Sequence, residues 1–71
     1  MAVGICSVIN LQKGYGEIMA EGGGNIRFQP EDVAAGNFEN LRGKKVYYEP
    51  RLRDHENYRM RRHAAHVKPI D

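Results

Sequence analysis

The sequence predicts an all-β protein whose residues 1–71 form one small domain, closed into a five-stranded barrel. Helical periodicity is nearly absent, and the chain divides into short extended runs. Glycine-rich or polar clusters separate these runs, which is typical of strands joined by turns. A domain of this size buries only about 60% of the surface that its unfolded chain exposes, so nearly every run has to contribute to one core.

The first three runs, at 3–9, 15–20 and 26–28, predict a three-stranded antiparallel meander. A polar turn at 11–14 links the first run to the second. Three successive glycines within 21–25 link the second to the third, because glycine adopts positive φ angles without steric strain.

A short helical turn is expected after the third run. Pro30 occupies a first helical position, and Glu31 and Asp32 follow it where acidic residues are favourable. We expect Val33 to point back toward the core and residues 34–43 to form a loop across the barrel.

The fourth strand is expected at 44–49, where Pro50 ends it. A polar excursion at 51–57 leads to the fifth strand at 58–70. Five strands with a longer link between the third and fourth are the plan of an OB-type barrel, and we expect them to be antiparallel. The segment 56–67 also has the composition of an amphipathic basic helix, but the barrel needs it as the closing strand.

Charge is distributed unevenly along the chain. Residues 1–40 contain two basic and five acidic residues, whereas residues 41–71 contain nine basic and four acidic ones. This asymmetry indicates an anionic partner for the second half. The single cysteine, Cys6, excludes an internal disulfide framework and favours a reducing, cytoplasmic setting. We find neither a secretory signal nor an apolar span of about 20 residues, so no membrane association is expected.

The chain resembles the bacterial cold-shock proteins over nearly its whole length. In the first half the resemblance is carried by Gly4, Asn10, the pattern KGYGxI at 13–18, the glycine-rich turn and the pattern IxFxxEDV at 26–33. In the second half it is carried by Phe38, Leu41, RGKKV at 42–46 and AAHVKPI at 64–70. The resemblance implies an OB-fold that binds single-stranded RNA or DNA, as an RNA chaperone or a transcription modulator.

The resemblance also implies where nucleic acid would bind. In the family, aromatic side chains on the first three strands stack on bases, at about 1–3 kcal/mol per base, and lysines beside them contact phosphates. Lys13 matches such a lysine, Tyr15 replaces a stacking phenylalanine, and Phe38 matches a loop aromatic. Tyr15 and Phe38 would either stack on bases or cap the barrel.

Most of the other stacking positions are changed. Val8 stands where the family has tryptophan, and Glu17 and Arg27 stand where it has phenylalanine. The remaining replacements are Ser7 for lysine, Gln29 for histidine and Pro30 for phenylalanine. Binding should therefore be weaker and more salt-dependent than in the family, because counterion release carries more of the affinity.

Glu17 and Arg27 fall on neighbouring antiparallel strands. We favour a cross-strand ion pair, worth about 0.2–1 kcal/mol. Alternatively, Glu17 repels phosphate while Arg27 donates to a base or to a protein carboxylate.

The second half adds arginines at 51, 53, 59, 61 and 62. Strand alternation places Arg59 and Arg61 on one face and Arg62 on the other. Phosphate contact is slightly favoured over two alternatives: a protein interface, where arginine is enriched, and a solvated edge that discourages aggregation.

Metal binding and catalysis are not expected. His63 and His66 are three residues apart and would face opposite sides of a strand, and no cysteine pair lies nearby. No nucleophile has a plausible base, and no cofactor is implied.

Two functions remain open: a monomeric binder of single-stranded nucleic acid, or a fold that has changed to binding a protein partner. The candidate nucleic-acid-binding residues are Lys13, Tyr15, Arg27, Phe38, Arg59 and Arg61.

Overall fold

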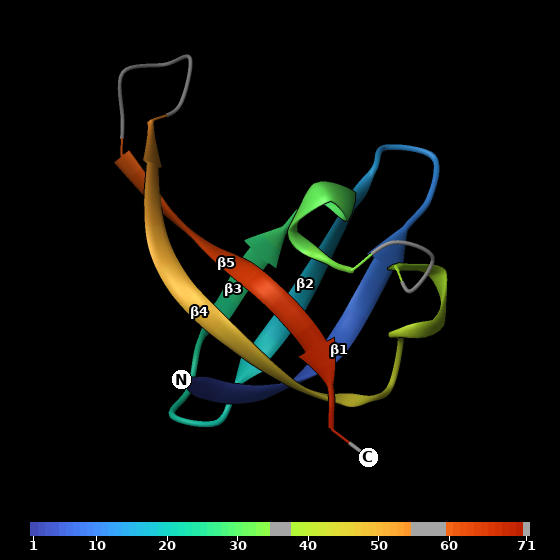
Figure 1. Cartoon of the computed structure of the whole chain (residues 1–71), viewed down its shortest axis with the longest axis horizontal. Helices are drawn as coiled ribbons and strands as arrows, with labels where there is room; N and C mark the ends of the chain where they lie inside the picture. The colour runs from blue at the N-terminus through green and yellow to red at the C-terminus, as the bar shows by residue number, and fades with distance from the viewer. Residues whose placement is uncertain (35–37, 55–59, 71) are drawn as a thin grey trace.

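The computed structural model describes residues 1–34, 38–54 and 60–70, without the side chains of residues 53, 54, 60 and 61. The strands are β1 (Ala2–Asn10), β2 (Tyr15–Ala20), β3 (Asn25–Phe28), β4 (Lys45–Asp54) and β5 (Met60–Pro69) (Figure 1). Two 3₁₀ turns, η1 (Pro30–Asp32) and η2 (Phe38–Asn40), lie between β3 and β4. Within these described ranges no helix is long and apolar enough to cross a membrane.

The strands close into a barrel in the order β1-β2-β3-β5-β4, which is an OB-type arrangement. The expected antiparallel pairing is found between β1 and β2, β2 and β3, β1 and β4, and β4 and β5. It is wrong for β3 and β5, which pair in parallel through Arg27 and His63. The reason is one of parity, because a closed ring of five strands cannot alternate direction at every pair.

The interior of the barrel follows the period-2 alternation of the strands. Cys6 on β1, Ile18 on β2 and Phe28 on β3 are almost completely buried. Other buried core residues are Ile26, Val33, Leu41, Val46, Tyr48, Ala64 and Val67. The core therefore takes side chains from every strand and from the segments beside η1 and η2.

The predicted turns are confirmed where backbone geometry tests them. Gly23 and Gly24 adopt φ angles of 105° and 79° in the turn between β2 and β3. After β3, η1 forms at the predicted position, and the Gln29 backbone N–H donates to Asp32 Oδ2 at 2.8 Å. Val33, directly after η1, is buried as expected.

The expected end of the fourth strand at Pro50 is wrong, because β4 continues to Asp54. β1 pairs with β4 only as far as Tyr48, so Pro50 lies on an edge where its missing N–H breaks no ladder. Pro50 still pairs with Ala64 of β5, and the paired ends of β4 and β5 extend away from the rest of the barrel (Figure 1). Residues 51–54 of the expected polar excursion are therefore strand.

The fifth strand is confirmed from Met60 to Pro69. The helical alternative for this segment is wrong over residues 60–67, and the rest of it lies at 56–59, outside the described residues.

Candidate nucleic-acid interface

The outer side of β1, β2 and β3 carries Tyr15 and Arg27, two of the residues that the sequence analysis predicted to bind nucleic acid. Strand register puts Val8 opposite Glu17 and Glu17 opposite Arg27, while Tyr15 pairs with Asn10 at the end of β1. We refer to Val8, Tyr15, Glu17 and Arg27 as the charged face. Its residues alternate with the buried ones, so the face is built on the same strands as the core.

The predicted ion pair across the charged face is confirmed. Arg27 Nη2 donates to Glu17 Oε2 at 3.0 Å. The Arg27 side chain is 60% exposed and that of Glu17 24% exposed. A pair this open to solvent contributes at most about 1 kcal/mol to stability, so its main effect is to orient Arg27.

Arg27 also contacts Tyr15. Its guanidinium carbon lies over the Tyr15 ring, 4.1 Å from the ring centroid, which is cation–π geometry. The guanidinium therefore covers one face of the ring that the sequence analysis predicted to stack on a base or to cap the barrel. Arg27 is held from two sides, by the Glu17 carboxylate and by the Tyr15 ring.

Lys13 lies in the exposed turn between β1 and β2, two residues before Tyr15. Its backbone N–H donates to Asn10 Oδ1 at 2.9 Å, and the Gly14 N–H donates to the Asn10 carbonyl oxygen at the same distance. Gly14 has a φ of 73°. The turn is thus fixed locally and places the lysine beside the charged face.

Phe38 packs differently from the residues of the charged face. Its half-buried ring meets the Phe28 ring edge-on, with centroids 5.7 Å apart and an interplanar angle of 73°. Such edge-to-face pairs stabilise aromatic clusters. Phe38 is therefore anchored on the hydrophobic core, in agreement with the barrel-capping alternative.

Two predicted residues are not placed with the charged face. Arg59 lies outside the described residues. Arg61 is a β5 residue whose backbone pairs with Arg53, and its side chain is not described. Their proposed contacts with nucleic acid remain predictions.

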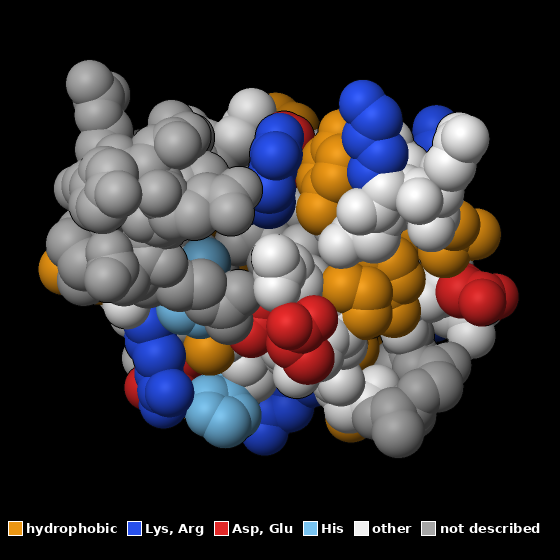
Figure 2. All heavy atoms as spheres, turned by 90° about the horizontal axis from the view of Figure 1, so that it is seen from above, with side chains coloured by type: hydrophobic (Ala, Val, Ile, Leu, Met, Phe, Trp, Pro, Cys, Tyr) orange, Lys and Arg blue, Asp and Glu red, His pale blue; other side chains and the backbone are white. Residues whose placement is uncertain are grey.

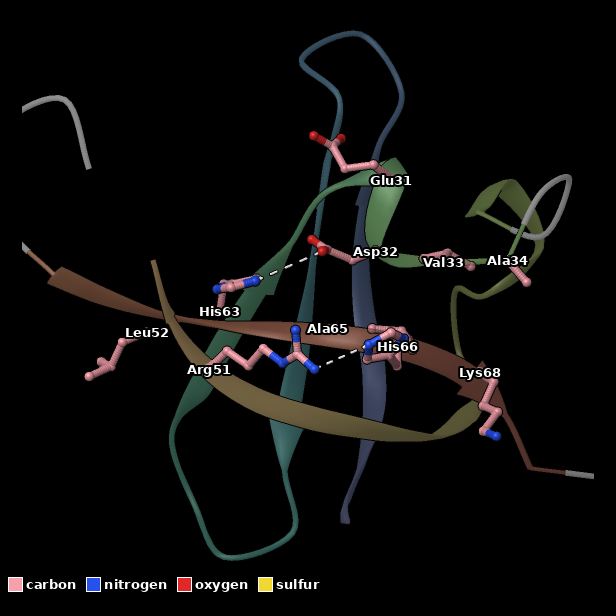
Figure 3. A pocket seen from close by; sticks show the side chains of 11 residues that line it. Glu31, Asp32, Val33, Ala34, Arg51, Leu52, His63, Ala65, His66 and Lys68 are labelled. Atoms are coloured by element: carbon pink, nitrogen blue, oxygen red, sulfur yellow. Dashed lines mark hydrogen bonds and ion pairs between the residues drawn. The ribbon is translucent and has the colours of Figure 1, made fainter. Parts of the chain in front are cut away.

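A polar groove next to the charged face was missed by sequence reasoning. It has a volume of about 820 Å³ and lies between η1 and the β4–β5 pair (Figure 3). Its polar lining residues are Glu31, Asp32, Arg51, His63, His66 and Lys68. Figure 2 shows histidine, basic and acidic side chains close together on one side of the molecule.

The groove depends on a bulge that sequence periodicity could not reveal. Tyr47 pairs with Lys68 and Glu49 with Ala65, so two β5 residues lie opposite one β4 residue. His66 lies in this bulge with a φ of 51°. The bulge shifts the alternation of β5, so His63 and His66 both line the groove. The expectation that they face opposite sides is therefore wrong.

Charged contacts organise the two sides of the groove. Arg51 donates from Nε and Nη2 to Glu49 Oε1, at 3.1 and 2.9 Å, and its Nη2 lies 3.3 Å from His66 Nε2. The hydrogen bond from Arg51 holds the pKa of Glu49 below its usual value. Across the groove, His63 Nε2 lies 3.9 Å from Asp32 Oδ1.

The Cys6 thiol is buried and donates to the Val8 carbonyl oxygen at 3.7 Å, and burial raises the pKa of the thiol. Its nucleophilic thiolate form is therefore disfavoured. Within the described ranges, no three histidine, cysteine or acidic side chains are grouped to hold a metal ion.

Comparison with protein-family models finds no match, and comparison with curated proteins finds none either.

Proposed function

We propose that this protein is a cold-shock-like OB barrel that binds single-stranded RNA or DNA through the charged face, as an RNA chaperone or a transcription modulator. A five-stranded barrel of this order offers a sheet surface on which single strands can lie. Lys13 supplies positive charge at one end of that surface, and Arg27 supplies it on the sheet itself.

The observation that carries this proposal is the position of Arg27 over Tyr15, at 4.1 Å. Bases stack on arginine guanidinium planes as well as on aromatic rings. Because the Arg27 side chain is 60% exposed, its outward side is open to a base. One aromatic platform is thus replaced by a platform that is itself cationic.

Binding of this kind should depend strongly on salt. Each phosphate contact to a single strand contributes about −0.7 to the slope of log affinity against log salt concentration. One such contact from Lys13 and one from Arg27 should therefore contribute a slope of about −1.4.

The test is a fluorescence-anisotropy titration with an oligonucleotide of about eight nucleotides, which is within the range of site sizes for OB-folds. Arg27→Ala should weaken binding by roughly 5- to 150-fold, as expected for the loss of one stacking partner. Lys45→Ala is the matched control, because Lys45 is exposed on β4 opposite Ile5, outside the charged face. Equal losses in the two variants, or an affinity that does not change with salt, would contradict the proposal.

A protein-binding function is the second candidate, and a different surface favours it. Ile5, Met19 and Tyr47 are 51%, 57% and 38% exposed. Met19 pairs with Ile5, and Tyr47 pairs with Val3, two residues before Ile5 on β1. Ile5, Met19 and Tyr47 thus lie on three neighbouring strands, and we refer to them as the apolar patch. Contiguous exposed apolar surface is typical of protein interaction sites.

Two lysines beside the apolar patch indicate the charge of the expected partner. Lys45 lies opposite Ile5, and Lys68 lies opposite Tyr47. The expected partner is therefore a protein segment that carries both apolar side chains and carboxylates.

A residue-resolved NMR titration with a peptide of alternating leucine and glutamate tests this candidate, with a leucine–lysine peptide as the control. Shifts at residues 5, 19 and 47 with the acidic peptide alone are expected. If neither peptide shifts these residues, the candidate is wrong. If the protein self-associates in analytical sedimentation, the apolar patch binds a second copy of the chain instead.

A further inference from the structure

We infer that the groove between η1 and the β4–β5 pair is a second nucleotide subsite, selective for bases that carry an exocyclic amino group. This inference rests on the proposed binding of single strands at the charged face. The groove is named the bipolar groove below, because its two sides carry opposite charge.

The bipolar groove continues the charged face. Arg27, the platform residue of β3, pairs with His63 of β5, and His63 lines the groove. A strand whose base rests on Arg27 therefore reaches the groove without leaving the surface of the sheet. The volume of about 820 Å³ is in the range of sites that hold small molecules of nucleotide size.

One side of the groove is basic. Arg51, His66 and Lys68 come from β4 and β5 and lie along the same side in Figure 3. Arg51 is held in place by Glu49 and lies beside His66, while Lys68 is exposed. These side chains are suited to a phosphate oxygen, with Lys68 as the principal cation.

The other side is acidic. Asp32 accepts the Gln29 N–H, and its Oδ1 lies 3.9 Å from His63 Nε2. His63 Nδ1 is buried and has no hydrogen-bond partner among the described residues. The other ring nitrogen, Nε2, faces Asp32 of η1. Glu31 is exposed and projects from η1 (Figure 3). We assign to the Glu31 carboxylate, at the η1 edge of the groove, the role of accepting a hydrogen bond from a ligand.

A nucleotide matches this distribution of charge. Its phosphate is anionic, and the amino groups of cytosine, adenine and guanine donate hydrogen bonds that acidic side chains accept. Thymine and uracil have no exocyclic amino group, so they gain nothing from Glu31 and still meet its negative charge. A free phosphate would use the basic side alone. The bipolar groove should therefore discriminate among bases.

The experiment compares oligo-dC with oligo-dT of about eight nucleotides at pH 7.5 and constant salt. Wild type should bind oligo-dC about three- to tenfold more tightly, as expected for one net hydrogen bond. Glu31→Ala should abolish this preference, because oligo-dC loses its hydrogen-bond acceptor while oligo-dT no longer meets the negative charge. Lys68→Ala should weaken both by a similar factor. The controls are Glu21→Ala, in the exposed turn after β2, and Lys45→Ala, each of which removes a charge outside the groove.

The outcomes separate this inference from the proposed function. If wild type binds neither oligonucleotide, both are wrong. If it binds both equally well, or if Glu31→Ala keeps the preference, the subsite is wrong while single-strand binding at the charged face stands. Circular dichroism of each variant establishes that the barrel is folded. If a variant unfolds, residue-resolved NMR of wild type decides, because oligo-dC must then shift residues 31, 66 and 68 more than oligo-dT does.

Discussion

The two faces of the β1–β2–β3 sheet follow different physical rules. The inner face carries Cys6, Ile18 and Phe28, all buried and apolar. The outer face alternates with it and carries Glu17 and Arg27, which contact each other and leave Arg27 exposed. Packing thus restricts the inner face to apolar side chains, while the outer face can change its chemistry without altering the fold. Four predictions test this separation, from the largest expected effect to the smallest.

Phe28→Ala should have the largest effect. Phe28 is among the largest fully buried side chains, and Phe38 packs edge-on against it. Removing such a ring costs about 3–5 kcal/mol, which is comparable to the whole stability of a domain this small. We expect the variant to be largely unfolded by circular dichroism at 25 °C. A urea midpoint close to that of wild type would show that the inner face tolerates a cavity of this size.

The Cys6 thiol should be protected by folding. It is buried, and its raised pKa means that less thiolate is present at any given pH than for a free thiol. We expect its alkylation at pH 8 to be about a hundredfold slower in the native protein than in urea, because reaction requires opening of the barrel. The control is a Cys6→Ala, Val8→Cys variant, whose thiol lies on the outer face. If both thiols react at the same rate, Cys6 is not protected by the core.

Gly4→Ala should be more destabilising than Gly22→Ala. A Cβ at Gly4 would lie 2.5 Å from both the Ile18 Cγ2 and the Met19 carbonyl oxygen. Because that oxygen belongs to the backbone of the paired strand, relieving the clash requires β1 and β2 to move apart. We expect a loss of about 1–3 kcal/mol in chemical denaturation. Gly22 has no atom within 4 Å of the corresponding position, so its variant should resemble wild type.

Glu17→Gln should have the smallest effect on stability. The ion pair with Arg27 is open to solvent, so its loss should cost about 0.2–1 kcal/mol, and less at 1 M salt. A double-mutant cycle with Arg27→Met isolates the pair. A coupling energy well above 1 kcal/mol that persists at high salt would mean that the outer face contributes to stability as the core does.

Local features of the fold were predictable from the sequence because each depends on a few neighbouring residues. Positive φ angles at Gly23 and Gly24 follow from the glycine cluster, and η1 follows from Pro30 and the acids behind it. The Glu17–Arg27 ion pair was predictable as well, since a short turn fixes the register of β2 and β3. Arg27 over the Tyr15 ring was not predicted, because the direction of a long side chain depends on all of its neighbours.

Features that depend on distant pairings were predicted incorrectly or missed. β4 continues through Pro50 because β1 pairs with β4 only as far as Tyr48, so no hydrogen bond from a Pro50 N–H is needed on that edge. Sequence order does not reveal where the pairing with β1 stops. The bipolar groove was missed because the bulge at His66 shifts the alternation on which face assignments rest. The sequence contains the residues of the groove, but His63 and His66 line the same groove only because β5 has one extra residue in the bulge.

By itself, the sequence determined which side chains enter the core, where the chain turns and where basic residues concentrate. These properties follow from a two-residue period and from the conformational preferences of glycine and proline, which act locally. Only the tertiary structure decided that β3 and β5 run parallel, that Arg27 covers Tyr15 and that η1 faces a basic side across a groove. Ring closure brings segments far apart in the chain together, and their contacts are set by the packing of the whole barrel.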